Sequence, residues 1–259
     1  MASRNPIQNN GRAETPARLS FEVPFVGRER EISQLGALHA QRKHVLIVGA
    51  AGVGKSALVE RVRAEDLSLL VSGRSRHLGE ICEGLEPHLG MEAAGVKLLQ
   101  RKKLLREAVA AAGRTVVFDG VGWTGPKVSS FFESLMERVP VWICARSEHP
   151  WDIGHFWPLL VRFERMEVRP FHLRDTQALV EAAVAAKSVP RGAAEIVEWL
   201  QRRSGGIPLV VCELLKELAS GRYDPDRAFD LKLLDLDRRI HNAVPGTGAS
   251  PGRVGQRPD

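Results

Sequence analysis

The chain is 259 residues long, with 44% hydrophobic residues, 26% charged residues and a net charge of +6. No apolar run approaches the roughly 20 residues of a membrane span, and the polar first 20 residues lack the apolar centre of a secretion signal, so we expect a cytoplasmic protein without membrane contact. The positive charge permits an anionic partner such as nucleic acid but does not require one.

The cysteine and histidine residues predict no metal site. Cys82, Cys144 and Cys212 are odd in number, lie far apart and form no C-x-x-C pair. The eight histidines show no ligand spacing either. We therefore expect three reduced thiols, with neither a zinc site nor a disulfide framework.

Strand and helix patterns alternate over the first two thirds of the chain. The strand segments are short and apolar, which is typical of strands buried on both faces. The alternation predicts an α/β fold in which helices cover both faces of a parallel sheet. We predict strands at 44–48, 68–72, 115–119, 141–144 and within 161–168, and helices at 28–40, 57–65, 78–89, 96–112 and around 131–139.

After Phe171 the strand patterns stop and only helical patterns follow. The apolar residues between positions 211 and 218 recur at i, i+3, i+4 and i+7, which indicates one buried helix face. Pro208 stands where this helix begins, a position that proline favours because no hydrogen bond is lost there. Two helices precede it, and a further helical piece is expected between Asp226 and Ile240. This part of the chain is therefore predicted to be a small helical subdomain.

The segment from Gly49 to Ser56, GAAGVGKS, fits the phosphate-loop pattern G-x-x-x-x-G-K-[ST] at every required position. It follows an apolar strand and precedes a helix. Glycines allow the backbone N–H groups to point into an anion-sized hollow, and the helix adds the positive end of its dipole. We expect Lys55 to reach the outer phosphates and the Ser56 hydroxyl to help hold Mg²⁺. The segment therefore predicts a site for a nucleoside triphosphate.

Two polar residues follow neighbouring apolar strands. Asp119 ends the third predicted strand, where a phosphate-loop protein needs a carboxylate to hold Mg²⁺ opposite Ser56. Arg146 follows the fourth, where a cation lies near the terminal phosphate and can report whether it is present. Lys55, Asp119 and Arg146 are therefore the predicted catalytic residues.

Positive charge concentrates on the predicted helix at 96–112. We expect its apolar positions Val96, Leu99 and Leu104 to face away from the charges. A solvated helix face and a contact with DNA or RNA both explain such a cluster. The charged residues are Lys97, Arg101, Lys102, Lys103 and Arg106.

Together with the phosphate loop, five further motifs resemble, in order, those of STAND-type ATPases and their AAA+ relatives, which belong to the ASCE class of P-loop proteins. The resemblance runs from about Phe21 to Ser220 and implies an ATP-binding domain followed by a helical lid. The motifs are Phe25–Glu31 (FVGRERE), Asp119–Trp123 (DGVGW), Ala145–Ser147 (ARS), Val168–Phe171 (VRPF) and Gly206–Pro208 (GIP).

The residue patterns and this resemblance divide the chain into four expected parts. They are a disordered tail at 1–20, a P-loop ATP-binding domain at 21–171, a helical lid subdomain at 172–241 and a second disordered tail, rich in Pro and Gly, at 242–259. STAND proteins normally continue with a winged-helix domain and long sensor or effector regions. By that resemblance the chain is a nucleotide-binding core plus lid.

The resemblance also implies where the base of ATP lies. Val26, Gly27 and Arg28 are expected on the adenine side, and Pro208 is expected to press on the base from the lid, because apolar side chains and a proline ring offer flat surface to a purine. The implied cofactors are ATP and Mg²⁺, with Ser56 and Asp119 on the metal. The expected nucleotide contacts are Val26, Gly27, Arg28, Gly49, Ala50, Ala51, Gly52, Val53, Gly54, Lys55, Ser56, Ala57 and Pro208.

One position departs from the family pattern in a way that bears on catalysis. The family usually has an acidic residue after the metal-holding Asp, and that base orients the attacking water; this chain has Gly120 there. Losing a positioned base costs roughly 10²–10⁴-fold in rate. Glu148 is a candidate substitute, although no pattern places it. We expect tight ATP binding with slow hydrolysis, or hydrolysis completed by a neighbouring subunit.

Three functions stay open at this level. The first is an ATP-driven switch whose lid closure recruits a protein partner or drives self-assembly. The second is a DNA-associated AAA+ ATPase of the kind that short mobile elements use to load or target a recombinase. The third is a non-hydrolysing scaffold that keeps ATP as a structural ligand. Arg138 and Arg165 are unranked candidates for an arginine finger.

Overall fold

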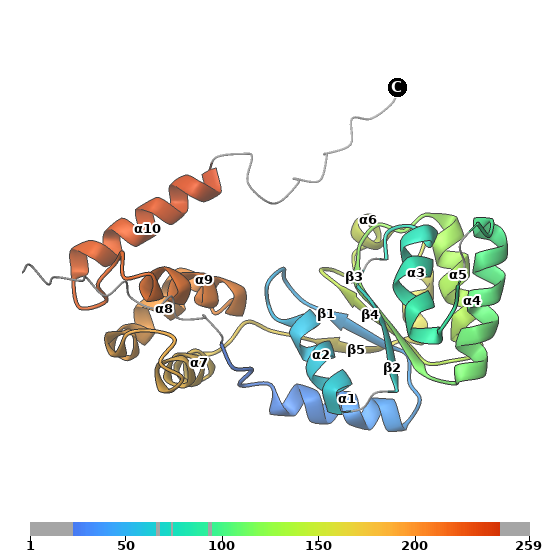
Figure 1. The fold of residues 1–259 in the computed structure, drawn as a ribbon, viewed down its shortest axis with the longest axis horizontal. Helices are drawn as coiled ribbons and strands as arrows, with labels where there is room; N and C mark the ends of the chain where they lie inside the picture. Colours follow the sequence, from blue (N-terminus) through green and yellow to red (C-terminus); the bar gives the residue numbers. More distant parts are fainter. Residues whose placement is uncertain (1–22, 66–67, 74, 93–94, 244–259) are drawn as a thin grey trace, which may run out of the picture.

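The computed structural model describes residues 23–65, 68–73, 75–92 and 95–243. Figure 1 shows two parts: an α/β domain from α1 (Glu29–Ala40) to β5 (Glu164–Glu167), and a helical subdomain from α7 (Leu173–Ala185) to α10 (Ala228–Ala243). The expected disordered tails lie outside the described residues, except that α10 continues to Ala243. Among the described residues, no helix combines the length and the apolar character that crossing a membrane requires.

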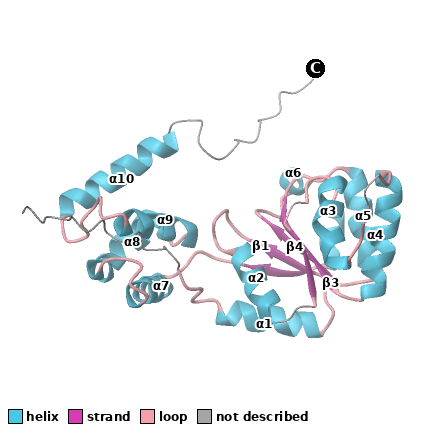
Figure 2. Ribbon diagram, in the orientation of Figure 1, coloured by secondary structure: helices cyan, strands magenta, loops and turns pink. Residues whose placement is uncertain are grey.

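The α/β domain is built on a sheet of five parallel strands, which Figure 2 shows in magenta. The strand order is β2-β3-β4-β1-β5, so β4 separates the strand before the phosphate loop from the strand that carries Asp119. Because all the strands are parallel, the carboxyl ends of β1, β3 and β4 meet at one edge of the sheet. The strands besides β5 are β1 (Val45–Val48), β2 (Leu69–Ser72), β3 (Thr115–Val121) and β4 (Val141–Ala145).

Helices cover both faces of this sheet, as predicted. Leu46 and Val48 of β1 belong to the core beneath α3 (Leu78–Leu85), α4 (Leu98–Ala112) and α5 (Pro126–Met136). Val45 and Ile47 point to the opposite face, against α1 and α2 (Lys55–Glu65). This alternation is the period-2 pattern of a strand buried on both sides. The predicted fold class, a three-layer P-loop sheet with a helical lid, is confirmed.

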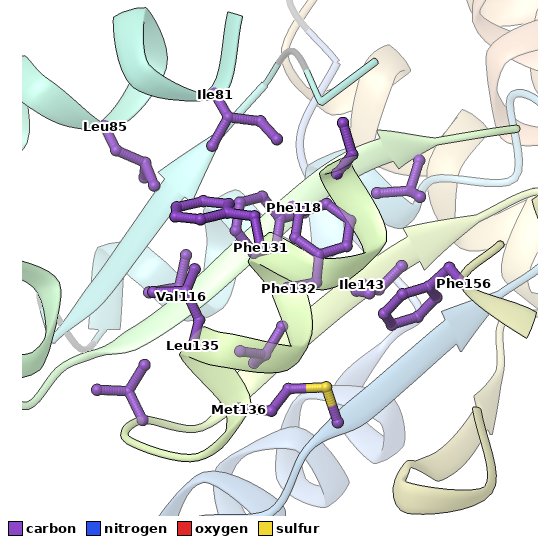
Figure 3. Close-up of a cluster of buried hydrophobic side chains, with 14 of the residues drawn as sticks. Ile81, Leu85, Val116, Phe118, Phe131, Phe132, Leu135, Met136, Ile143 and Phe156 are labelled. Atoms are coloured by element: carbon purple, nitrogen blue, oxygen red, sulfur yellow. The ribbon is translucent and has the colours of Figure 1, made fainter. Parts of the chain in front are cut away.

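Aromatic side chains fill the core under α3, α4 and α5 (Figure 3). The ring centroids of Phe118 and Phe132 lie 4.3 Å apart, and those of Phe132 and Phe156 lie 5.4 Å apart in an edge-to-face arrangement. All three side chains are fully buried. Each such ring buries roughly 150–250 Å² and packs with defined geometry, so the cluster fixes α5 against the strand that ends at the candidate site.

The helical subdomain has a separate hydrophobic core. Leu179 and Val180 of α7 pack there with residues of the following helices, and Leu231 and Leu234 of α10 complete it. Pro208 occupies the first turn of α9, as the sequence predicts. The remaining short elements are η1 (Glu86–Leu89), α6 (Pro150–Ile153), η2 (Trp157–Arg162), η3 (Arg191–Ile196), α8 (Val197–Ser204) and α9 (Pro208–Ala219).

Candidate functional site

The phosphate loop connects β1 to α2 at the carboxyl edge of the sheet, as the motif requires. The Gly49 N–H donates to the Ala145 carbonyl at 3.3 Å, which ties the loop to the neighbouring strand β4. The Val53 side chain is fully buried and anchors the middle of the loop in the core. Ser56 lies exposed in the first turn of α2, where the N–H groups of a helix N-terminus have no partner within the helix.

The Lys55 ammonium lies over the loop. Its Nζ donates to the Gly49 carbonyl at 2.8 Å and to the Ala50 carbonyl at 2.9 Å. Burial lowers the pKa of this ammonium, and the Arg146 guanidinium lowers it further, while Cys144 and the Asp119 carboxylate act in the opposite direction. The ammonium therefore stands among the loop carbonyls and the charges at the ends of β3 and β4.

The structure brings Asp119 and Arg146 together with Lys55. The half-buried Asp119 carboxylate acts on Lys55 and on Cys144 beside it. Burial, and secondarily that carboxylate, raise the pKa of the Cys144 thiol well above its ordinary value. Arg146 is exposed and near enough to influence Lys55. The three residues that the sequence predicts as catalytic thus converge at one edge of the sheet.

The protein donors available to a magnesium ion at this edge are few. In the described part of the chain, no group of three or more His, Cys, Asp or Glu residues is arranged to hold a metal ion. Ser56 and Asp119 supply a hydroxyl and a carboxylate. That set fits Mg²⁺, which proteins commonly hold with one or two such oxygens together with substrate phosphates. It does not fit a metal bound by protein ligands alone.

Gly120 has a conformational reason to be glycine. Its φ of +66° lies in the left-handed region, and the pairing of β3 with β4 shifts register between Phe118 and Val121. The strand continues to Val121, two residues beyond its predicted end at Asp119. A Cβ at Gly120 would meet nothing within 4 Å, so a larger side chain has space but pays for backbone strain.

Glu148, the candidate substitute for the missing base, is held by an ion pair. Its Oε2 accepts a hydrogen bond from Arg165 Nε at 2.8 Å, and both side chains are about half exposed. Arg165 also pairs with Glu167 at 3.6 Å. The carboxylate and one of the two arginine-finger candidates are therefore partners of each other in this structure.

The helical subdomain touches the phosphate loop directly. The Leu209 N–H, at the start of α9, donates to the Gly52 carbonyl at 3.1 Å. Gly52 has a φ of +75°, and a Cβ there would lie 2.9 Å from Leu209 Cβ and 3.1 Å from Ile207 Cγ2. Only glycine therefore fits beneath α9 at this point of the loop. Pro208, which the sequence predicts on the nucleotide, lies between the two residues that make this contact.

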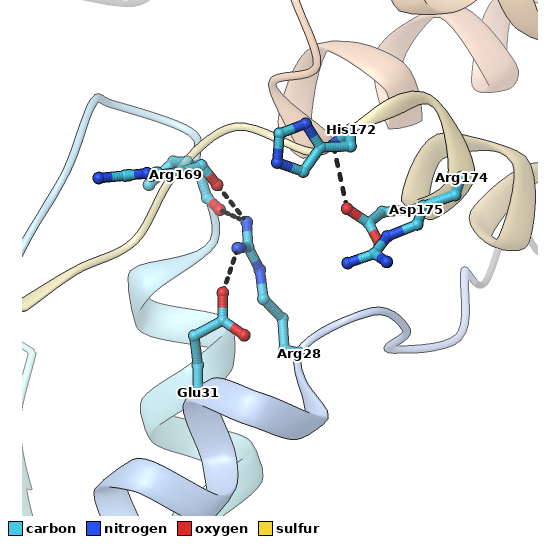
Figure 4. Close-up of polar contacts among 7 residues, drawn as sticks. Arg28, Glu31, Arg169, His172, Arg174 and Asp175 are labelled. Carbon is cyan, nitrogen blue, oxygen red and sulfur yellow. Dashed lines mark hydrogen bonds and ion pairs between the residues drawn. The ribbon is translucent and has the colours of Figure 1, made fainter.

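Arg28 joins three parts of the molecule, as Figure 4 shows in part. Its Nη2 donates to the Val53 carbonyl of the loop at 3.0 Å and to the Arg169 carbonyl, after β5, at 2.8 Å. Its Nη1 binds Glu31 Oε1 at 2.7 Å, and its guanidinium lies 4.7 Å from the centroid of the Phe171 ring. Arg28 is only 5% exposed. Tertiary contacts of this kind leave no signal in a sequence motif.

Val26 and Gly27 directly precede this arginine in the chain, and both contact the helical subdomain. Val26 packs against the core of that subdomain, and a Cβ at Gly27 would lie 3.3 Å from Asp175 Cβ of α7. A cavity of about 620 Å³ opens here, lined by residues that include Arg28 and Arg169, and its lining contains no residue of the phosphate loop. Arg28 stands between the cavity and the loop, because it lines the former and binds Val53 of the latter.

The basic helix α4 differs from its prediction. Arg101 Nε and Nη2 bind the Glu86 carboxylate at 2.9 and 2.6 Å, and both side chains are largely buried. Leu105 faces the core, whereas Leu99 is 81% exposed. Leu99 and Leu104, which the sequence predicts to face away from the charges, are both exposed, and Leu105 and Val109 form the buried face of α4. Consecutive apolar residues on a helix point to different sides, and the sequence alone does not choose between them.

The fold and these motifs can be compared with known proteins. Residues 24–144 match the family model of the AAA ATPase domain. No curated protein matches the sequence. The structure resembles the ORC1 protein of Aeropyrum pernix solved in complex with DNA, with a TM-score of 0.60 and 15% identity over 86% of this chain and 68% of that one.

Two further solved structures share the fold. The Walker-type ATPase of Pyrococcus abyssi has a TM-score of 0.55 and 16% identity, over 85% of this chain and 77% of that one. A STAND protein with a tetratricopeptide repeat sensor, from Pyrococcus horikoshii, has a TM-score of 0.50 and 19% identity. The match covers 82% of this chain but only 32% of that protein.

The five-stranded parallel sheet, with the phosphate loop at the carboxyl end of β1, defines a P-loop NTPase α/β fold. The family match makes this more specific: residues 24–144 match the AAA ATPase domain, which supports an AAA+ P-loop ATPase. The resemblance that the sequence motifs indicate is confirmed at this level.

Proposed function

We propose that this protein binds MgATP at the phosphate loop and works as a molecular switch. In this proposal, closure of the helical subdomain over the bound nucleotide controls the recruitment of a partner or self-assembly. The observation that carries it is the hydrogen bond from the Leu209 N–H to the Gly52 carbonyl. Because a helix start of one part rests on the phosphate loop of the other, a ligand that reshapes the loop also acts on the lid.

The contacts of the loop support the following roles for its residues. Lys55 Nζ would exchange the Gly49 and Ala50 carbonyls for the outer phosphate oxygens, which are stronger acceptors because they carry charge. Ser56 and Asp119 would hold Mg²⁺, which neutralises phosphate charge when bound. Arg146 would face the terminal phosphate and distinguish ATP from ADP. These four side chains form the proposed site for phosphates and metal.

We propose that Val26, Gly27 and Pro208 contact the adenine base of ATP, and that Arg28 has a different role. Its guanidinium is committed to the Val53 and Arg169 carbonyls and to Glu31, so it offers little to an adenine ring. We propose that Arg28 holds the loop to the linker that leads into the lid. The remaining contacts of the loop with phosphate would come from the backbone N–H groups between Gly49 and Ala57.

We propose that hydrolysis is slow, because no carboxylate follows Asp119. Gly120→Glu is expected to raise the steady-state rate of phosphate release about tenfold or more, since a positioned base contributes roughly 10²–10⁴-fold and the open space at position 120 admits the side chain. The phosphate-release rates of the wild type and of the variant are both measured at saturating MgATP. The substitution strains the backbone, so Gly120→Gln is the matched control: it has the same size and strain but no basic group.

Equal rates for the glutamate and glutamine variants would contradict this explanation of slow turnover. A wild-type rate below detection, together with MgATP binding, would favour the scaffold alternative, in which ATP is a structural ligand. A fast wild-type rate that needs high protein concentration would instead favour hydrolysis completed by a neighbouring subunit.

DNA binding is a second candidate function, favoured by the exposed positive residues Lys97 and Lys103 of the α4 region. Arg101 is excluded because it pairs with Glu86. If the cluster tracks phosphates, the double substitution Lys97→Glu and Lys103→Glu is expected to weaken duplex DNA binding and to reduce the salt slope of the affinity by roughly 2.

The measurement is fluorescence anisotropy with labelled duplex DNA at several salt concentrations, with ATP present. The control is the double substitution Lys187→Glu and Lys216→Glu, which changes the same net charge at exposed positions of the helical subdomain. An equal loss in both variants would assign the effect to net charge alone. No binding by the wild type at low salt would exclude this function.

A further inference from the structure

Helix α10 carries an apolar stripe that points away from the protein. The stripe recurs at intervals of four, three and four residues, which is the a/d spacing of a coiled-coil seam. Figure 1 shows α10 at the outer edge of the helical subdomain, beyond α8 and α9. The residues of the stripe, called here the α10 seam, and their exposed fractions are Phe229 (73%), Leu233 (38%), Leu236 (52%) and Ile240 (52%).

The opposite face of α10 is already used. Leu231 and Leu234 are buried in the core of the helical subdomain. Arg238 binds Glu213 of α9 at 3.3 Å, and Asp235 binds Arg203 of α8 at 3.2 Å. The helix is therefore fixed in place with its seam outward. A partner would dock on a preformed surface and would not have to order the helix, which lowers the cost of association.

The charges beside the seam follow a strict pattern. With Leu233 and Ile240 at a positions, the e positions are Asp230 and Asp237, and the g position before the second heptad is Lys232. Arg239 occupies the next g position. One edge of the seam is thus acidic and the other basic, within a stretch of about two heptads. Within the chain, Asp237 already accepts a hydrogen bond from the Tyr223 hydroxyl and Asp230 accepts one from the Asp224 N–H. Arg239 pairs with Asp235 at 2.8 Å, so Lys232 is the charge that a partner would mainly meet. Residues at e and g positions set the choice and the orientation of partners in coiled coils.

We propose that the α10 seam binds a second copy of this chain, with the two α10 helices parallel. In a parallel pair, the g position of one helix faces the e position of the next heptad in the other, so Lys232 of each copy meets Asp237 of the other. The Asp237 carboxylate would then accept from Lys232 of the second copy as well as from Tyr223 of its own chain. In an antiparallel pair, e faces e and g faces g, which opposes Asp to Asp and Lys to Arg. A self-complementary surface of this kind also suits the two-fold symmetry common in homodimers.

The association does not depend on the proposed ATP site. The seam is formed by the helical subdomain alone, so nucleotide-free protein is expected to dimerise. Four apolar residues per copy make a small interface, and the dimer is therefore expected to be weak and concentration-dependent. Failure of the proposed function, seen as absent MgATP binding, would leave this inference standing, and the two are tested separately.

The first experiment is sedimentation equilibrium of the full chain without nucleotide, up to several hundred micromolar. The wild type is expected to reach twice the monomer mass. Leu236→Glu is expected to weaken association at least about 100-fold, because two buried leucines are lost per dimer and two charges enter the seam. Leu99→Glu on α4 is the matched control, since it makes the same change at an exposed residue far from α10.

The second experiment tests the orientation. Ile240→Cys, in a background where the partly buried Cys212 is replaced by Ser, is oxidised under mild conditions. In a parallel pair, position 240 meets its own copy, so a disulfide-linked dimer is expected in good yield. In an antiparallel pair, position 240 lies opposite position 229, about 11 residues and thus roughly 16 Å away from its copy along the helix axis.

Circular dichroism and thermal melting confirm that each variant is folded. A wild type that stays monomeric at the highest concentration overturns the proposal. So does a Leu236→Glu variant that associates as strongly as the Leu99→Glu control. Association through the seam without a disulfide at position 240 overturns the parallel arrangement.

Discussion

Lys55→Ala is expected to weaken MgATP binding at least about 100-fold. The Lys55 ammonium already donates two hydrogen bonds to loop carbonyls, at 2.8 and 2.9 Å, and phosphate oxygens would replace those acceptors. Hydrogen bonds to charged groups contribute roughly 1.5–3 kcal/mol each, so the loss of two gives a change of this size or larger. The measurement is isothermal titration calorimetry of the purified protein with MgATP.

The fold of the Lys55 variant is not expected to change. The two carbonyls that lose their donor lie in the loop at the edge of the sheet, where water can replace it, so the melting temperature should match that of the wild type. Arg63→Ala is the matched control: it removes one positive charge from the same helix, at a surface pair with Glu60. Unchanged affinity in the Lys55 variant, or an equal loss in the control, would refute the site assignment.

Arg28→Ala is expected to lower the free energy of unfolding by about 3 kcal/mol. The 5% exposed arginine donates to the Val53 and Arg169 carbonyls and pairs with Glu31, and it stacks on Phe171. Removing it leaves polar partners in a buried region with no donor, which costs roughly 1–3 kcal/mol per group, while water that enters the new space recovers part of this. Urea unfolding followed by circular dichroism measures the effect.

Two further variants make this result specific. Arg28→Lys is expected to recover only part of the loss, because an ammonium is a point donor and lacks the planar fork that reaches three acceptors and lies on the Phe171 ring. Arg30→Ala, at the exposed neighbouring position, is expected to change stability by less than about 0.5 kcal/mol. A loss in the Arg28→Ala variant no larger than in the Arg30 variant would show that the network contributes little.

The sequence predicted the sheet and the phosphate loop well because both depend on local patterns. Short apolar strands alternate with amphipathic helices, and the loop motif sets its own geometry between β1 and α2. The gathering of Lys55, Asp119 and Arg146 followed from one rule, that the ends of parallel strands meet at one edge. Their roles with ATP and Mg²⁺ stay predictions.

What the sequence did not predict depends on contacts between distant segments. The motif implied a place beside adenine for Arg28, whereas the structure gives it two backbone carbonyls from residues far along the chain. The sequence placed Arg101 in a row of charged residues on the basic helix, for which a solvated face was one explanation, whereas in the structure it forms a largely buried ion pair with Glu86. On α10, apolar residues lie on both sides of the helix, and only the packing of Leu231 and Leu234 shows which stripe is outward.

The hydrogen bonds of Arg28 have a consequence for which amino-acid substitutions the protein tolerates. Two of its three acceptors are peptide oxygens, which every amino acid provides, so replacing the side chains of residues 53 and 169 would leave those hydrogen bonds in place. The connection between the phosphate loop and the segment after β5 therefore depends almost entirely on the side chain at position 28. Substitutions at positions 53 and 169 would keep these two hydrogen bonds, whereas a single substitution at position 28 removes both.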